Sequence, residues 1–265
     1  MNIDMLFEKS FTKSEGGVIL KSKNEIDIMR QAGKVVATML DTLAKSVQPG
    51  MSTQQLDRIA VEELRRLDAK PAFLGYYGFP ATICVSVNDQ IVHGIPGSLV
   101  MREGDVVSID AGAVVDGFYG DAAVTVGVGD ISTEAKQLID VTREALMKGI
   151  EAVKVGDRIS DIGAAIQKYI ESKGTFGIVR EYVGHGIGRS LHEDPPVPNF
   201  GDPGLGLLLQ AGMVIAIEPM VNVGGQETQI LDDGWTVTTS DGTLSAHFEH
   251  SVALTECGPE ILTVL

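Results

Sequence analysis

Ser108-Ile-Asp110-Ala-Gly-Ala-Val-Val-Asp116-Gly-Phe-Tyr-Gly-Asp121 is the stretch that decides the fold. It predicts a β-hairpin, in which one apolar strand carries Asp110, Asp116-Gly117 makes the turn, and the returning strand carries Asp121. A carboxylate inside an apolar strand is costly to bury unless a cation or hydrogen-bond donors compensate it. Two carboxylates that face each other across one hairpin therefore suggest a metal site.

Helical spacing of apolar residues occurs twice, once on each side of this hairpin. Helices are expected over 24–47 and from Ser52 or Thr53 to about residue 67, and again over 133–153 and 159–173. The hairpin itself should cover about 105–128. Further β-rich runs, separated by loops, are 81–87, 91–95, 178–183, 213–223, 235–239 and 245–254. The order helix, helix, strands thus appears twice.

A weak internal repeat accompanies this order. Gly104-Asp-Val-Val-Ser-Ile-Asp110 matches Gly212-Met-Val-Ile-Ala-Ile-Glu218, which lies 108 residues later. Upstream, Gly50 matches Gly156 at an offset of 106. The repeat predicts two equivalent halves, about 23–130 and 131–265, each presenting a carboxylate-bearing strand to their shared interface. Residues 1–22 show no sustained period, so we expect an N-terminal extension with a short edge strand near 18–20.

Composition favours one large globular domain, which we place at 23–265. The chain has 265 residues, of which 44% are hydrophobic. Its 21 basic and 36 acidic residues give 21 − 36 = −15, which argues against a general nucleic-acid or anionic-membrane binder. Cys84 and Cys257 form no CxxC pair, and neither a signal peptide nor an apolar run of roughly 18 residues occurs. We expect a soluble cytoplasmic protein.

Five residues are candidate metal ligands: Asp110, Asp121, His185, Glu218 and Glu249. Any one of the acids could instead pair with an arginine or cap a turn. Together they need more cationic compensation than the surrounding strands supply, because few lysines or arginines lie there. Four carboxylates and one imidazole exceed a single zinc site and suit two adjacent ions. An oxygen-rich set with one nitrogen favours Mn, Fe(II) or Co-like ions.

The other histidines are less telling from sequence alone. His93 lies between apolar residues, as a core histidine would, and His192 could be an exposed loop histidine. His247 and His250 flank Glu249 and are expected to be structural. The glycine-rich segment around His185 lacks the GxGxxG pattern of dinucleotide binding, and no serine lies in a G-x-S-x-G elbow.

Taken in order, these motifs closely resemble type I methionine aminopeptidases over about residues 18–265. The motifs that carry the resemblance are His93-Gly-Ile-Pro, Asp110, Gly117-Phe-Tyr-Gly-Asp121, Gly184-His185-Gly-Ile-Gly-Arg, His192-Glu, Ile217-Glu218-Pro-Met and Phe248-Glu249-His. The resemblance implies the α+β pita-bread fold, in which two pseudo-symmetric halves form a curved, mostly antiparallel sheet covered by helices.

The resemblance also implies roles for the candidate residues. Asp110 would chelate one ion, Asp121 and Glu249 would bridge, and His185 and Glu218 would ligate the other ion. The cofactors would be two divalent ions per chain, Co, Mn, Fe(II) or Zn, which activate a bridging water. His93 and His192 would contact the scissile amide and stabilise the tetrahedral intermediate, while Glu218 could shuttle protons.

A methionine pocket is implied as well, with an aromatic-and-sulfur lining suited to a thioether. Its residues would be Tyr76, Phe79, Cys84, Leu191 and Trp235. Phe79 and Leu191 stand where tyrosine and phenylalanine are common, and the N-terminal extension lacks the zinc-binding cysteines of eukaryotic cytosolic members. The expected reaction is removal of the initiator methionine from nascent chains and peptides with a small second residue. We expect a monomer that could work near the ribosome.

Two alternatives stay open at this point. An Xaa-Pro aminopeptidase or prolidase would share the fold, but such enzymes usually carry an additional N-terminal domain, and only about 23 residues precede the first long helix here. A non-catalytic protein that has lost its metals would show a broken ligand set, whereas all five ligand positions are filled.

Overall fold

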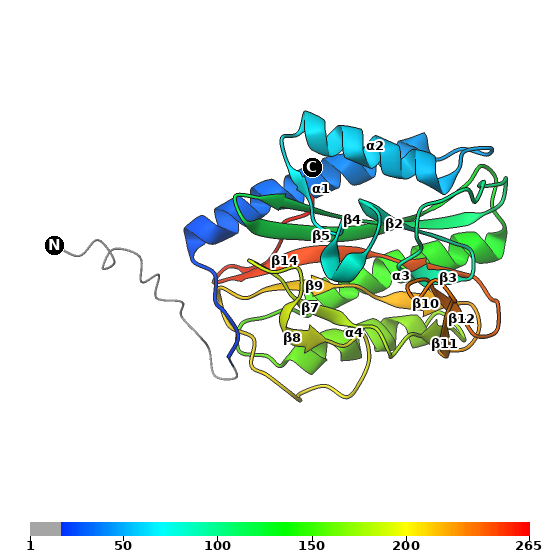
Figure 1. The fold of residues 1–265 in the computed structure, drawn as a ribbon. Helices are drawn as coiled ribbons and strands as arrows, with labels where there is room; N and C mark the ends of the chain where they lie inside the picture. Colours follow the sequence, from blue (N-terminus) through cyan, green and yellow to red (C-terminus); the bar gives the residue numbers. More distant parts are fainter. Residues whose placement is uncertain (1–16) are drawn as a thin grey trace.

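Four α-helices and a large antiparallel sheet make up residues 17–265, the part of the chain that the computed structural model describes (Figure 1). The helices are α1 (Lys23–Ser46), α2 (Thr53–Arg66), α3 (Thr133–Glu151) and α4 (Ile159–Glu171). All four expected helices are therefore present. Helix α1 begins earlier than expected, because Ser22 rather than Asn24 is its N-cap and forms a capping box with Glu25.

The strands of the described residues are mostly short. They are β1 (Lys70–Pro71), β2 (Ile83–Val87), β3 (Gln90–Val92), β4 (Val106–Val115), β5 (Phe118–Gly127), β6 (Gly177–Ile178), β7 (Gly184–Gly186), β8 (Glu193–Val197), β9 (Val214–Ile217), β10 (Met220–Asn222), β11 (Thr228–Ile230), β12 (Val237–Thr239), β13 (Ser245–His247), β14 (Glu249–Thr255) and β15 (Gly258–Ile261). The largest sheet runs β1-β4-β5-β14-β9-β7-β8, with β2 on β4 and β15 on β14. Two three-stranded sheets, β13-β10-β6 and β11-β12-β3, complete the arrangement.

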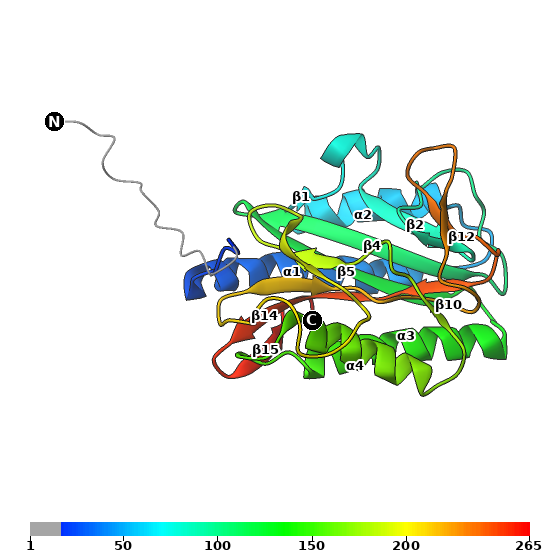
Figure 2. The same cartoon turned by 90° about the horizontal axis from the view of Figure 1, so that it is seen from below.

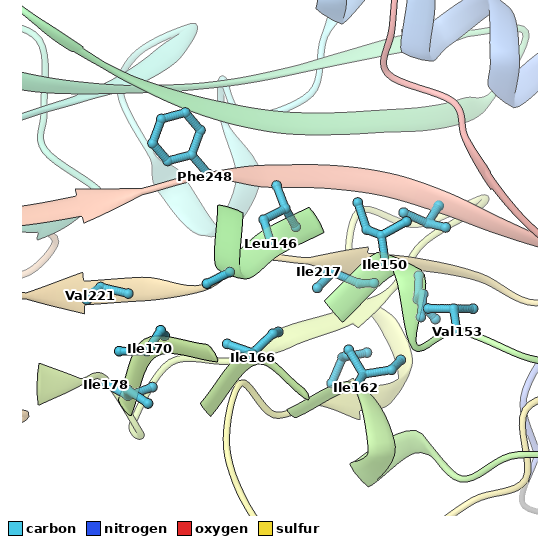
Figure 3. Close-up of a cluster of buried hydrophobic side chains, with 14 of the residues drawn as sticks. Leu146, Ile150, Val153, Ile162, Ile166, Ile170, Ile178, Ile217, Val221 and Phe248 are labelled. Atoms are coloured by element: carbon cyan, nitrogen blue, oxygen red, sulfur yellow. The ribbon is translucent and has the colours of Figure 1, made fainter. Parts of the chain in front are cut away.

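The helices cover the sheet as two pairs. Helices α1 and α2 pack on β2, β4 and β5 through one apolar cluster, and α3 and α4 pack on β9, β10 and β14 through another. Figure 1 shows α2 above the strands and α4 below them, and Figure 2 shows α3 and α4 side by side with α1 and α2 behind β4 and β5. Figure 3 shows part of the second cluster, in which Ile217 is drawn between Leu146 and Ile150 of α3 and Ile162 and Ile166 of α4. These helices bury one face of the sheet and leave the other for a site.

The hairpin forms as predicted, with its turn at Asp116-Gly117. Both turn residues have positive φ, 48° for Asp116 and 79° for Gly117, a conformation that Asp-Gly favours. The two strands are in register throughout, and Asp110 pairs with Ala123. Because side chains alternate, Val107 and Ile109 contact the helices while Asp110 points to the opposite face.

Two strands of the second half are interrupted, whereas the hairpin strands of the first half are continuous. We call the place where these two interruptions meet, at Pro219 and Phe248, the crease. Pro219 has no N–H to donate to a ladder, and the expected strand over 213–223 is divided there into β9 and β10. The expected strand over 245–254 is divided at Phe248, whose N–H donates to the Pro219 carbonyl at 3.4 Å. Glu218 and Glu249 both lie at this crease.

The repeated glycines share their backbone conformation. Gly104 and Gly212 have φ of 92° and 94°, and Gly50 and Gly156 have φ of 86° and 95°. We propose on this basis that 23–130 and 131–265 are the equivalent halves of one domain. Of the proposed extension, 1–22, only residues 17–22 are among the described residues, and Ile19 there forms a single β-bridge. No helix among residues 17–265 has the length and apolar character needed to cross a membrane.

Candidate metal centre and active site

One register row crosses four strands on the face away from the helices. Cys84 pairs with Asp110, Asp110 with Ala123, and Ala123 with Glu249. Paired residues point to the same face of a sheet, so the carboxylates of Asp110 and Glu249 flank the small Ala123 side chain. The methyl group of Ala123 leaves room between the two carboxylates.

Asp121 enters the same face two residues from Ala123 and is 4% exposed. Its backbone is fixed by Ser251 of β14, whose hydroxyl accepts from the Asp121 N–H at 3.1 Å and donates to the Asp121 carbonyl at 2.8 Å. The hydroxyl thus locks β5 to β14 at the position where the carboxylate is needed.

His185, on β7, points a free ring nitrogen at two of the acids. Its Nδ1 lies 2.8 Å from the Gly186 carbonyl. A carbonyl can only accept, so Nδ1 carries the hydrogen and Nε2 is left with its lone pair. Nε2 lies 3.6 Å from Oε1 of Glu218 and 4.0 Å from Oδ2 of Asp121. A side chain at Gly186 would collide with the Asp194 carbonyl, which explains the glycine beside the histidine.

At the crease, Glu218 and Glu249 complete the acid cluster, and His247 joins it. Asn199 donates its side-chain N–H to the Glu218 carbonyl at 3.1 Å. His247 Nε2 lies 3.6 Å from Oε2 of Glu218. His247 was expected to be structural; it ends β13, and its ring nitrogen lies near the carboxylates of Glu218 and Glu249, across the strand break at Phe248.

Burial and mutual repulsion disfavour the ionised form of the four clustered acids. Burial raises the pKa of Asp110 to about 7 and that of Glu218 to about 8, and it raises the pKa values of Asp121 and Glu249 well above the usual range. The neighbouring carboxylates raise the pKa values of Asp121 and Glu249 further. Burial also lowers the pKa of His185 to about 3, so its imidazole is neutral near pH 7. Neutral imidazole and clustered carboxylates are the forms that bind cations.

The donor atoms fit a metal. Four of the buried side-chain atoms that lack any hydrogen-bond partner converge here: Asp110 Oδ1, Asp121 Oδ1, Glu249 Oε1 and His247 Nε2. Such atoms are rarely left unpaired in a protein interior. Two overlapping groups have donor spacing suited to an ion, one of Asp121, His185 and Glu249 and one of Glu218, His247 and Glu249. Glu249 belongs to both groups.

A cavity of about 350 Å³ opens onto these acids. All twelve residues that the sequence proposes for the site line it, together with Phe73 and Tyr77, which the sequence did not single out. The twelve are Tyr76, Phe79, Cys84, His93, Asp110, Asp121, His185, Leu191, His192, Glu218, Trp235 and Glu249. Residues from both halves of the chain therefore meet in one space.

Two histidines stand between the acids and the apolar end of this cavity. His93 has a φ of 61°, a strained value for a residue with a side chain, and strain of this kind is concentrated at functional sites. His192 is an exposed loop residue, as the sequence allowed, but it is not isolated: its ring centroid lies 4.1 Å from that of His185, and its Nδ1 lies 2.8 Å from the Tyr76 hydroxyl. Burial lowers the pKa of His93 to about 4 and also lowers that of His192.

The apolar end is built from aromatic rings and a thiol. Phe79, Cys84 and Leu191 are buried, and Phe79 meets Trp235 edge-on with ring centroids 5.1 Å apart. The Trp235 ring centroid also lies 6.4 Å from that of His93, which joins the apolar wall to the polar part. Tyr77, by contrast, is 85% exposed and stands at the rim. Burial raises the pKa of the Cys84 thiol, so the sulfur is an uncharged part of the wall.

Known proteins match this chain along nearly all of its length. A methionine aminopeptidase of Clostridium perfringens is 56% identical over 248 residues, which are 94% of this chain and 99% of that protein. Methionine aminopeptidase 1 of Bacillus subtilis is 51% identical and covers 93% of this chain and 99% of its own length. The crystal structure of methionine aminopeptidase from Thermotoga maritima superposes with a TM-score of 0.92 at 47% identity, covering 94% of this chain and all (100%) of that one.

More distant structures share the fold. Prolidase from Pyrococcus furiosus superposes with a TM-score of 0.74 at 22% identity, and 65% of its chain is covered. These neighbours confirm the expected α+β pita-bread fold. The model of metallopeptidase family M24 matches residues 27–256. With its ligand types, its cavity and its fold in place, the chain belongs to metallopeptidase family M24.

Proposed function

We propose that this protein is a metal-dependent methionine aminopeptidase, which hydrolyses the first peptide bond of chains that begin with methionine and prefers a small second residue. The observation that carries the proposal is the single cavity of about 350 Å³ with acids and imidazoles at one end and an aromatic-and-sulfur wall at the other. The relatives named methionine aminopeptidase, at 51 to 56% identity over nearly the whole chain, support it.

The proposed cofactors are two divalent ions per chain, from among Co, Mn, Fe(II) and Zn. Asp110, Asp121, His185, Glu218 and Glu249 would hold them, with Glu249 shared because it belongs to both donor groups. When bound, such ions supply an acidified water and a Lewis acid for the scissile carbonyl. In their ionised form the four clustered acids need a cationic partner, since the described residues place no lysine or arginine ion pair on any of them.

Around these ions the chain's own residues would bind and orient the peptide. His93 and His192 are neutral near pH 7, so they act as hydrogen-bond donors to the scissile amide rather than as fixed cations. Tyr76 fixes the direction of the His192 ring through the 2.8 Å contact. Glu218 lines the same cavity, and its carboxylate could take up a proton from the water and pass it to the leaving amine.

The wall of Tyr76, Phe79, Cys84, Leu191 and Trp235 would hold the methionine side chain. Aromatic edges and a neutral sulfur make favourable contacts with a polarisable thioether and do not require hydrogen bonds from it. The substrates would be peptides and nascent chains, and the site of action the cytoplasm.

A pair of peptides tests this proposal. The metal-reconstituted protein should release methionine from Met-Ala-Ser, should leave Ala-Pro-Ser intact, and should lose its activity on chelation. Preference for Ala-Pro-Ser would move the protein to the Xaa-Pro peptidases, whose likeness here extends to the fold alone. Failure to cleave Met-Ala-Ser with Co, Mn, Fe(II) or Zn would reject the proposed activity.

A further inference from the structure

His247 is a buried imidazole with a ring nitrogen that has nothing to bond. The residue ends β13, is 1% exposed, and its Nε2 lacks a hydrogen-bond partner. The nearest acid oxygen is Oε2 of Glu218 at 3.6 Å, which is too long for a hydrogen bond. An unpaired nitrogen in so enclosed a place calls for a partner that the protein does not itself provide.

His247 lies at the same distance from the Glu218 carboxylate as His185 does. Each imidazole places Nε2 at 3.6 Å from one oxygen of the same carboxylate, His185 from Oε1 and His247 from Oε2. Two donors that bind one ion at about 2.0–2.2 Å lie no more than about 4 Å apart. Both separations therefore have the length expected of two ligands to one ion.

The backbone of His247 is held as firmly as that of Asp121. The hydroxyl of Thr125 accepts from the His247 N–H at 2.9 Å and donates to the His247 carbonyl at 2.7 Å. Ser108 lies 2.8 Å from the same hydroxyl. Ser251 makes the same pair of contacts to Asp121. In both places a hydroxyl on a neighbouring strand fixes the backbone from which a donor side chain projects.

We propose that His247 is a sixth residue of the metal centre and binds an ion directly through Nε2. Each of the two donor groups then contains one imidazole, His185 in one and His247 in the other, and Glu249 is common to both. The inference rests on the proposed metal-dependent function and extends its ligand set. A second nitrogen also raises the affinity for Co(II), Fe(II) or Zn(II) relative to Mn(II), because imidazole suits the former ions and carboxylate the latter.

Counting the metal-bound imidazoles tests the inference. In proton NMR of the Co(II)-loaded protein, each cobalt-bound imidazole contributes one strongly shifted, exchangeable N–H signal. We expect two such signals in the unaltered protein, and this count needs no variant. His247→Gln should remove one signal and His185→Gln the other.

His250→Gln is the matched control. His250 is on the adjacent strand β14, three residues further along, where its Nδ1 lies 2.8 Å from the Thr263 hydroxyl and its ring lines a different pocket, beneath α1. This variant should keep both signals. Circular dichroism of each metal-free variant shows whether it is folded, so a missing signal is not confused with a lost fold.

A single shifted signal that persists in His247→Gln would overturn the inference and leave His247 as a neighbour of the centre. Binding measurements give a second readout. His247→Gln should lose about 10-fold or more in Co(II) affinity and less in Mn(II) affinity, and equal losses would also count against ligation. A protein that cleaves Met-Ala-Ser with one bound imidazole would keep the proposed function and lose this inference. A protein with two metal-bound imidazoles that does not cleave Met-Ala-Ser would keep this inference and lose the proposed function.

Discussion

The two halves of the site supply their donors in different ways. In the first half, Asp110 and Asp121 project from one uninterrupted hairpin of two ten-residue strands. In the second half, Glu218, His247 and Glu249 lie where strands break, at Pro219 and Phe248, and His185 comes from the three-residue strand β7. The first half is thus a local structure, and the second is assembled from segments far apart in the chain.

This difference teaches how one face of a sheet can hold so many acids. A regular hairpin presents every second side chain, so it can offer two carboxylates without any irregularity. The other donors lie at or beside interruptions of the strands, at Pro219 between β9 and β10 and at Phe248 between β13 and β14. Glu249 stands in the same register row as Asp110, and the donor atoms of Glu218 and His247 lie close to its carboxylate.

Removal of one acid from each half should have the largest effect and tests whether the halves contribute equally. Asp110→Asn and Glu218→Gln remove charge without changing shape, and each should lose bound metal and more than ~100-fold of the peptidase activity. Metal analysis and Met-Ala-Ser hydrolysis measure both. Asp116→Asn, an exposed substitution in the turn of the same hairpin, should change neither. Full metal content in the Asp110→Asn variant would show that Asp110 of the hairpin does not bind an ion.

A larger side chain between the halves should have the next largest effect. Ala123→Val fills the space between Asp110 and Glu249 and should lower metal affinity about 10- to 100-fold. Ala122→Val is the matched control, because it overpacks the opposite face beneath α1 at a similar cost in stability, about 1–3 kcal/mol. Titration calorimetry separates the two variants. Equal metal affinities of the Ala123→Val and Ala122→Val variants would show that Ala123 does not lie beside the bound ions.

The contact between Tyr76 and His192 links an aromatic of the first half to a histidine of the second. Tyr76→Phe removes the hydrogen bond and keeps the ring, so kcat for Met-Ala-Ser should fall roughly 5- to 10-fold with a smaller change in KM. Tyr77→Phe, in a residue that is 85% exposed, should have little effect. A Tyr76→Phe enzyme with unchanged kcat would mean that the ring of His192 needs no such support.

The smallest predicted effect is a pH dependence of the metal-free protein. Burial raises the pKa of Asp110 to about 7 and that of Glu218 to about 8, whereas both groups are already ionised at these pH values in the unfolded chain. The native state therefore binds more protons, and the free energy of unfolding should fall as pH rises from about 7 to 8. The histidines, with a usual pKa of about 6.5, are mostly neutral in both states in this window.

Thermal unfolding in the presence of a chelator measures this effect. Tm should drop by a few degrees between pH 7 and 8, and Asp110→Asn should reduce the slope because it removes one of the titrating groups. Saturating metal should raise Tm, most of all at the higher pH. A Tm that rises across this window would contradict the clustering of protonated acids.

Sequence patterns predict the structure of the first half more completely than that of the second. The helical periods predict all four helices, and alternation with an Asp-Gly turn predicts the hairpin and the face of Asp110. The strands that were missed, such as β1 and β7, have two or three residues, too few for a period to show. The nearness of His247 to Glu218 was not foreseen, because it depends on the strand breaks at Pro219 and Phe248, which alternation does not show.

The number of ions that one chain binds tests the central claim most directly, since the claim is that both halves complete one dinuclear centre. Calorimetric titration of the metal-free protein with Co(II) should end at two ions per chain, and Met-Ala-Ser hydrolysis should appear as the ions are added. Binding of a single ion at saturation, or of none, would contradict the account.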